Sequence, residues 1–233
     1  MNRTKIEWTD YTWNPITGCR HGCKYCYARK IATRFKDAFP NGFEPTFHQE
    51  RLRDPFSVKK PSKIFTVSMG DMFGEWVPEE WVIPIFQVMG ACKQHTFQIL
   101  TKNPKRINSV VSGDLFSPNI WLGTSVESSS ARNRIDELRK VPRFKKFVSF
   151  EPLKEEVRPN LTDIDWVIIG AQTNPLVLPD WKWIDRIVYE ADINQIPVFV
   201  KNNVVDHANA RGYQDFPEDV AQNETSPQNL EGE

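Results

Sequence analysis

The amino-acid sequence predicts an α/β protein with a parallel sheet of about six strands, and three observations support this. Short runs rich in β-branched and aromatic residues alternate about six times with segments of helix length. The runs are apolar at successive positions, as in strands that are buried on both faces. Polar residues follow directly after them, where parallel α/β proteins build their sites. Two architectures fit this pattern, a doubly wound sheet and a partial, open β/α barrel.

The elements are expected in a regular order along the chain. Strands are predicted at 63–68, 97–101, 120–126, 147–151, 166–170 and 197–201, and an earlier one within 11–16. Helices are predicted at 78–94, 128–140 and 179–194, each with apolar residues at helical spacing. A run of serines can cap the second helix, and Asp180 is a plausible N-cap of the third. The common glycine-rich nucleotide fingerprints are absent from the sequence.

Composition and charge indicate an ordinary globular protein of the cytoplasm. The 233 residues are 39% hydrophobic and 26% charged, with no apolar run long enough to span a membrane. The first residues lack the apolar stretch of a signal peptide, so we expect no secretory leader. Residues 214–233 contain six acidic residues and no lysine or arginine, so we expect an acidic, disordered tail after a single domain at 1–213. The net charge is zero, and the domain therefore carries an excess of six positive charges.

Three of the four cysteines lie within eight residues, in the order Cys19, Cys23 and Cys26. Three thiolates on one short loop can bind three corners of an iron–sulfur cube and leave the fourth iron open. Zinc is the alternative, with His21 as a fourth ligand, but ligands two residues apart fit poorly around one tetrahedral ion. The fourth cysteine, Cys92, lies near the end of a predicted helix and is expected to be a core or surface thiol.

The order of motifs resembles a known superfamily. The C-x3-C-x-aromatic-C loop after the first strand is similar to that of radical S-adenosylmethionine (SAM) enzymes. The wider series resembles a phage-associated three-cysteine family of radical SAM-like proteins of largely unassigned function. The motifs that carry this resemblance are Ile6–Asp10, Thr12–Pro15, Ser68–Phe73, Leu100–Lys102, Trp121–Gly123, Ser125–Glu127, Ser149–Leu153 and Asp165–Gly170. Of the two architectures, the resemblance implies the partial barrel.

The resemblance also implies roles for single positions. The three cysteines would ligate a [4Fe-4S] cluster, and S-adenosyl-L-methionine would chelate its open iron. The cofactor would be contacted by Tyr25 and Gly170 near its adenine, Ser68, Met69, Gly70 and Asp71 near its amino group, and Ser125 and Glu127 near its ribose. Asp71 could accept a hydrogen bond from the ammonium. An electron donor such as a flavodoxin or ferredoxin would be a partner.

The substrate is expected on the far side of the same site. Lys102 and Lys201 are candidates for holding an anionic group, and Gln172 stands where the family usually has an acid. Basic residues around the cysteines favour a nucleotide, modified base or nucleic acid as the substrate. A radical enzyme acting on a small molecule or peptide, and a zinc or iron–sulfur module without catalysis, are the two alternatives.

Overall fold

The structure is a computed structural model that describes residues 1–111, 113–207, 210 and 212–217. Within these residues the main sheet has eight strands in the order β1-β2-β5-β6-β7-β8-β9-β10. Their bounds are β1 (Asn2–Arg3), β2 (Tyr11–Trp13), β5 (Lys63–Thr66), β6 (Thr96–Thr101), β7 (Ile120–Ser125), β8 (Lys145–Phe150), β9 (Trp166–Ile169) and β10 (Val198–Val200). Only β1 pairs antiparallel with its neighbour. The predicted α/β fold with a mostly parallel sheet is confirmed.

The strand order follows the chain order without turning back. A doubly wound sheet reverses its strand order at a switch point, so that alternative is wrong for this chain. The six predicted runs correspond to β5 through β10, with ends that agree to within about two residues. The strand expected before the cysteines is divided between β2 and β3 (Ile16–Thr17), and β3 pairs with β4 (Thr46–Phe47) in a second, small sheet.

The helices are α1 (Tyr27–Arg34), α2 (Glu79–Ala91), α3 (Ile107–Val110), α4 (Asn133–Arg139), α5 (Trp181–Ile193) and α6 (Asn202–Val205). Short 3-10 turns lie at Gln49–Arg51, Asp54–Ser57, Pro104–Arg106, Gly113–Leu115 and Ser129–Ala131. The three predicted helices are confirmed as α2, α4 and α5, and the Asp180 carboxylate caps α5 by accepting a hydrogen bond from Lys182 N. The serine cap on α4 is wrong, because the Ser129 hydroxyl and amide both donate to Glu155 instead.

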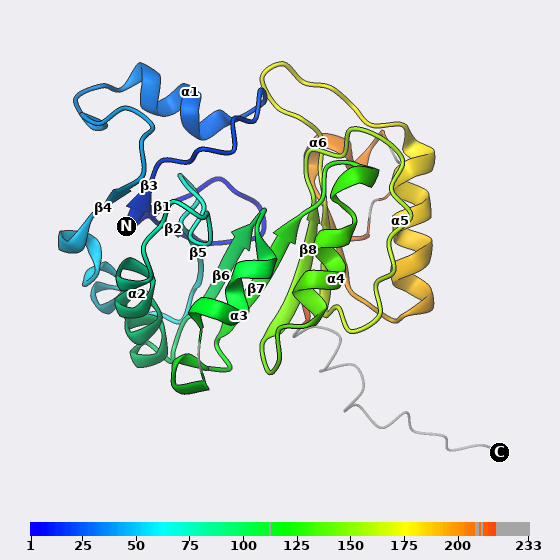
Figure 1. The fold of residues 1–233 in the computed structure, drawn as a ribbon. Coiled ribbons are helices and arrows are strands. Elements are labelled where there is room, and N and C mark those ends of the chain that lie inside the picture. The colour runs from blue at the N-terminus through cyan, green and yellow to red at the C-terminus, as the bar shows by residue number, and fades with distance from the viewer. Residues whose placement is uncertain (112, 208–209, 211, 218–233) are drawn as a thin grey trace.

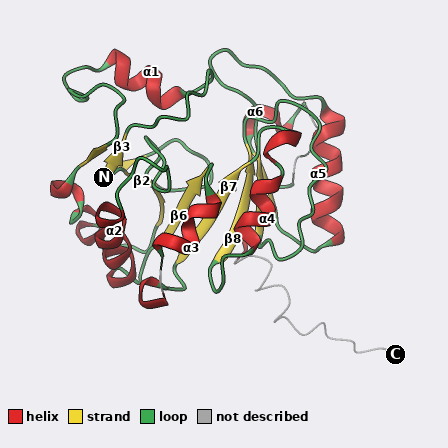
Figure 2. Ribbon diagram, in the orientation of Figure 1, coloured by secondary structure: helices red, strands yellow, loops and turns green. Residues whose placement is uncertain are grey.

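The sheet has a different core on each face. Helices α2, α4 and α5 pack with strand residues such as Ile64, Leu122 and Val167 in one large apolar cluster. The opposite face carries an aromatic cluster that includes Phe147 and Trp166 and is covered by the N-terminal segment. Both faces are therefore buried, which is why the strand sequences are apolar at successive positions. Figure 1 shows α1 apart from the other helices, beyond the arrow ends of the strands, and Figure 2 separates helix from strand in the same view.

The first residues of the predicted acidic tail pack against the sheet. Of the predicted acidic tail, Gln214 bridges to Phe199, and the Phe216 ring packs 5.3 Å from that of Trp166. Residues 218–233, which hold most of its acidic residues, lie outside the described part of the chain. Among the described helices, none combines the length and the apolar character that crossing a membrane requires.

Candidate functional site

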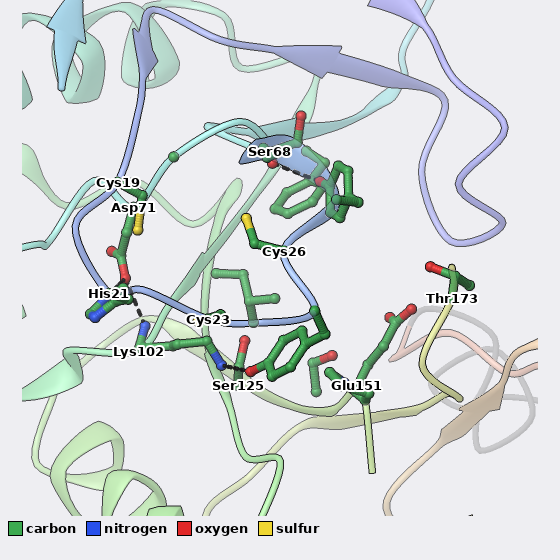
Figure 3. Close-up of a pocket in the computed structure, with 18 of the residues that line it drawn as sticks. Cys19, His21, Cys23, Cys26, Ser68, Asp71, Lys102, Ser125, Glu151 and Thr173 are labelled. Carbon is green, nitrogen blue, oxygen red and sulfur yellow. Dashed lines mark hydrogen bonds and ion pairs between the residues drawn. The ribbon is translucent and has the colours of Figure 1, made fainter. Parts of the chain in front are cut away.

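A cavity of about 350 Å³ lies at the carboxyl ends of the parallel strands, beneath the cysteine loop. Figure 3 shows its labelled residues converging from the loop and from several strand ends. Most of the predicted site residues line it, namely Cys19, Cys23, Tyr25, Cys26, Ser68, Gly70, Asp71, Lys102, Ser125, Gln172 and Lys201. The residues Met69, Glu127 and Gly170 lie just outside this lining. The cavity is mostly apolar with a few convergent polar groups, as is usual for ligand sites.

The cysteine loop is tied to the end of β5 through its backbone. Gly18 N donates to Met69 O at 2.9 Å, and Gly18 bridges to Gly70. Gly18 has a φ of +88°, and a Cβ there would lie 2.1 Å from Glu44 O, so only glycine fits. A Cβ on Gly70 would lie 2.9 Å from Gly18 O. We therefore find that Gly70 serves close backbone packing, which brings the loop over the cavity.

The three cysteine thiols are each partly buried in this cavity. Cys26 is the N-cap of α1, and its Sγ accepts a hydrogen bond from Arg29 N at 3.3 Å. Burial raises the pKa of the Cys19 thiol to about 12, and the nearby Asp71 carboxylate adds to this rise. Cys19 therefore keeps its proton unless a metal displaces it. Within the described residues, no three His, Cys, Asp or Glu side chains form a group that could hold one metal ion.

The Asp71 carboxylate connects the cysteine loop to the end of β6. Its Oδ1 accepts hydrogen bonds from Phe73 N at 3.0 Å and Thr101 Oγ1 at 2.6 Å. Its Oδ2 accepts from Lys102 N at 2.9 Å and lies 2.7 Å from His21 Nε2. A carboxylate offers about four acceptor sites, and Asp71 fills them within the protein. It therefore has no site left for an ammonium, and the expected contact to a cofactor amino group does not fit this geometry.

His21 is held in place by contacts with Asp71 and Trp76. Its ring nitrogen is engaged by Asp71, and its ring packs edge-on against Trp76 at 4.9 Å. The arrangement suits a side chain that fixes the loop between Cys19 and Cys23.

A second network joins Tyr25 of the loop to the ends of β6 and β7. Lys102 Nζ donates to Tyr25 Oη at 3.0 Å and to Glu127 Oε2 at 2.9 Å, and Tyr25 Oη donates to Glu127 Oε1 at 3.1 Å. Arg134 donates to the same carboxylate at 2.9 Å. Burial alone would raise the pKa of Glu127, but Lys102 and then Arg134 overcome it and hold that pKa below its usual value. Lys102 is thus neutralised by a carboxylate rather than free for an anion.

A third charged pair lies at the ends of β8, β9 and β10. Lys201 Nζ forms a close ion pair with Glu151, and both side chains line the cavity. Gly170 lies between them, and a Cβ there would be 2.9 Å from Lys201 Cδ. The glycine therefore makes room for this pair. Lys201, like Lys102, has an acidic partner, so neither lysine is placed as an isolated anion-binding group.

Sequence reasoning missed several lining residues. The Tyr27 hydroxyl donates to Ser68 O at 2.6 Å and helps separate this cavity from a second one of about 620 Å³ near the N-terminus. Ser149 and Trp8 also line the main cavity, and both are almost fully buried. Alternation along β8 could have pointed to Ser149, because it shares a face with Phe147. Gln172 lines the cavity too, while its amide donates to Pro175 O.

These features define a class of protein, one with a parallel α/β sheet in consecutive strand order and a three-cysteine loop over a cavity at its carboxyl edge. The chain belongs to the DUF5131 family of proteins of unknown function, whose sequence pattern matches residues 3–221. An uncharacterized protein of Methanocaldococcus jannaschii is 25% identical over 190 residues, which cover 75% of this chain and 70% of that protein.

Solved structures of spore photoproduct lyase share this fold. A mutant of that enzyme with bound AdoMet and dinucleoside spore photoproduct matches with a TM-score of 0.53 and 12% identity, over 73% of this chain. Another structure, complexed with dinucleoside spore photoproduct, matches with a TM-score of 0.51 and 11% identity. This chain spans 58% of the first of these lyase chains, so the likeness concerns the shared fold.

Proposed function

We propose that this protein is a radical SAM enzyme that binds a [4Fe-4S] cluster through Cys19, Cys23 and Cys26. The observation that carries the proposal is the placement of all three thiols around one cavity at the carboxyl edge of the sheet. Two findings support it: the superfamily's three-cysteine spacing, and the fold shared with a lyase solved with AdoMet. We also infer that the sheet is the partial, open β/α barrel implied by the resemblance to that superfamily.

The donor set fits an iron–sulfur cluster better than a single zinc ion. In a cluster each thiolate binds a different iron, so the three sulfur atoms need not converge on one point. A single zinc ion needs its ligands to converge, and within the described residues no group of three His, Cys, Asp or Glu side chains could hold one metal ion. When bound, such a cluster would supply the electron that cleaves S-adenosylmethionine into methionine and a 5′-deoxyadenosyl radical.

The residues around the loop would hold it in place and shield the cavity. The Asp71 contacts fix one side of the loop at His21, and the Lys102–Glu127 pair fixes the other side at Tyr25. Ser125 is nearly buried in the cavity wall and remains our candidate for a contact to the cofactor's ribose. Glu127 would act there by positioning, since its carboxylate is occupied by Lys102, Arg134 and Tyr25.

We propose a nucleotide or nucleic acid as the substrate class. Exposed basic residues lie on the cysteine loop and on α1, which follows it, namely Arg20, Lys24, Arg29, Lys30 and Arg34. Such residues can contact phosphates, and binding through them weakens as the salt concentration rises. The dinucleoside bound by spore photoproduct lyase supports the same class. A small molecule or peptide is the competing substrate class.

The test is anaerobic reconstitution followed by iron and sulfide analysis and an assay for 5′-deoxyadenosine. We expect the wild type to hold about four irons and to cleave the cofactor under strong reduction. Cys23→Ala should lose both properties, and Cys92→Ala is the matched control, because Cys92 is buried in the core away from the loop. Unchanged cluster content in Cys23→Ala, or stoichiometric zinc in place of iron, would refute the proposal.

Substrate class is tested separately by anisotropy with labelled DNA and RNA oligonucleotides over a range of salt concentrations. Replacing Lys24 and Arg34 by alanine should weaken binding and flatten its salt dependence. Affinity that does not vary with salt, or an absence of binding, would favour the small-molecule or peptide alternative.

A further inference from the structure

Glu151, Gly170 and Lys201 occupy equivalent positions on three adjacent strands. Each is the first residue after its strand, and the sheet order places β9 between β8 and β10. The ladder continues through them, since Gly170 N donates to Phe150 O at 3.1 Å and Lys201 N donates to Ile169 O at 3.0 Å. The glycine leaves a gap in the row of side chains. The Glu151 and Lys201 side chains meet across that gap.

Because side chains alternate along a strand, those of Glu151 and Lys201 point to the face of the sheet that carries the aromatic cluster. Glu151 shares a face with Phe147 and Ser149, and Lys201 shares a face with Phe199. Figure 3 shows Glu151 and Thr173 across the cavity from Asp71 and His21. The pair therefore lies on the opposite side of the cavity from the contact between Asp71 and His21.

This pair keeps more hydrogen-bonding capacity than the other charged groups of the cavity. Asp71 accepts four bonds, and Lys102 is shared between Tyr25 and Glu127. Among the described residues, Glu151 uses one carboxylate oxygen and Lys201 one N–H direction, both for each other. One oxygen of Glu151 and two donor directions of Lys201 are left for a ligand.

The cost of burying this pair argues for a role in binding. The side chains are only 25% and 14% exposed, and taking two charges out of water costs several kcal/mol for each ion. Replacing such a pair with apolar residues is often neutral or stabilising, so the pair is not needed to hold the fold. The free carboxylate oxygen of Glu151 lies beside the free N–H groups of Lys201. Together they match the edge of a ligand that carries one acceptor beside one N–H.

We propose that Glu151 and Lys201 read the edge of a nucleobase. The Watson–Crick edge of every base places an acceptor beside an N–H group, and the apolar walls formed by Ile6, Phe65 and Pro152 suit a flat ring. A phosphate does not match, because it would meet the Glu151 carboxylate. The inference rests on the proposed function for its choice of a nucleic-acid ligand, and it deepens that proposal by assigning the base to the cavity.

The test measures equilibrium binding of thymidine, N3-methylthymidine, adenosine and inorganic phosphate to the full-length protein by calorimetry. The test variant is Glu151→Leu/Lys201→Met, which removes the pair without leaving a buried charge. Its matched control is Glu137→Leu/Lys140→Met, an ion pair on the outer surface of α4. We expect the test variant to unfold at the same denaturant concentration as the wild type or at a higher one.

We expect thymidine to bind the wild type, N3-methylthymidine to bind it more weakly, and the test variant to bind thymidine roughly 10- to 100-fold more weakly. If the test variant binds adenosine as tightly as the wild type does, the base that the pair contacts belongs to the substrate. If the variant also binds adenosine more weakly, that base is the adenine of the cofactor. The nucleobase assignment holds in both cases. The methylated ligand tests the proposal in the wild type alone, even if the variant does not fold.

The proposal is overturned if no nucleoside binds, if methylation at N3 has no effect, or if phosphate is the ligand that depends on the pair. These results are independent of cofactor cleavage. A protein that binds nucleosides through this pair but never cleaves S-adenosylmethionine would refute the proposed function and leave this inference standing.

Discussion

Asp71→Asn should destabilise the protein strongly although it changes a single atom. Four donors surround the carboxylate, which is only 3% exposed. An asparagine offers one oxygen, and its amide must face either Phe73 N or Lys102 N. The Thr101 hydroxyl and the His21 ring can reorient to accept a bond, but a backbone N–H cannot. One buried donor is therefore left unpaired, at a cost of about 1–3 kcal/mol.

The remaining bonds also lose the strength that an ionised acceptor provides, so we expect a total loss of about 3 kcal/mol in the free energy of unfolding. Urea denaturation of the cluster-free chain measures this directly. Asp165→Asn is the matched control, because that exposed carboxylate accepts from Lys146 N at 2.7 Å and an asparagine oxygen can keep the bond. A loss for Asp71→Asn no larger than that of the control would refute the reasoning.

Two further predictions concern the strand ends and the aromatic face. The pKa of Glu127 is lower in the folded protein than its ordinary value of 4.5, so its ionised form stabilises the fold above that pH. Glu127→Gln should be less stable than the wild type at pH 7, and the difference measured by urea should shrink as the pH falls through the folded-state pKa; a constant difference would contradict this. Gly123→Ala should cost about 1–3 kcal/mol, because its Cβ would lie 2.5 Å from the packed Phe147 ring. Gly90→Ala, with 3.9 Å of space on α2, is the control and should be neutral or stabilising.

The fold was predictable where a segment is buried on both sides. The strands β5 through β10 each have one face in the helix-packed core and one in the aromatic cluster, so the apolar signal is continuous. The two-residue strands β1, β3 and β4 are too short for any periodicity to show. Helix α1 was missed because only Ala28 and Ala32 are buried in it, and its other positions are mostly charged or polar.

The sequence predicted where the site lies, but not which charged side chains pair with one another in it. Parallel strands end at one edge, so the polar residues that follow them had to gather there. The partners of each charge depend on side-chain directions across the sheet, which the chain order does not show. Lys102 and Lys201 therefore looked like free cations in the sequence, while the structure gives each a carboxylate from a neighbouring strand end.

These ion pairs make the cavity nearly neutral, whereas the exposed residues outside it are basic. The charged side chains that line the cavity are Asp71, Glu151, Lys102 and Lys201, two acids and two bases, and each has an oppositely charged or hydrogen-bonding partner. The basic residues on α1 and on the cysteine loop, which lies over the cavity, are exposed, and we call them the basic rim. A neutral interior favours an uncharged ring, whereas a basic rim favours phosphates. We infer that a nucleic-acid substrate would keep its backbone at the rim and present only a base to Glu151 and Lys201. The loss of affinity at high salt should then depend on the rim residues. Discrimination between bases should depend on Glu151 and Lys201.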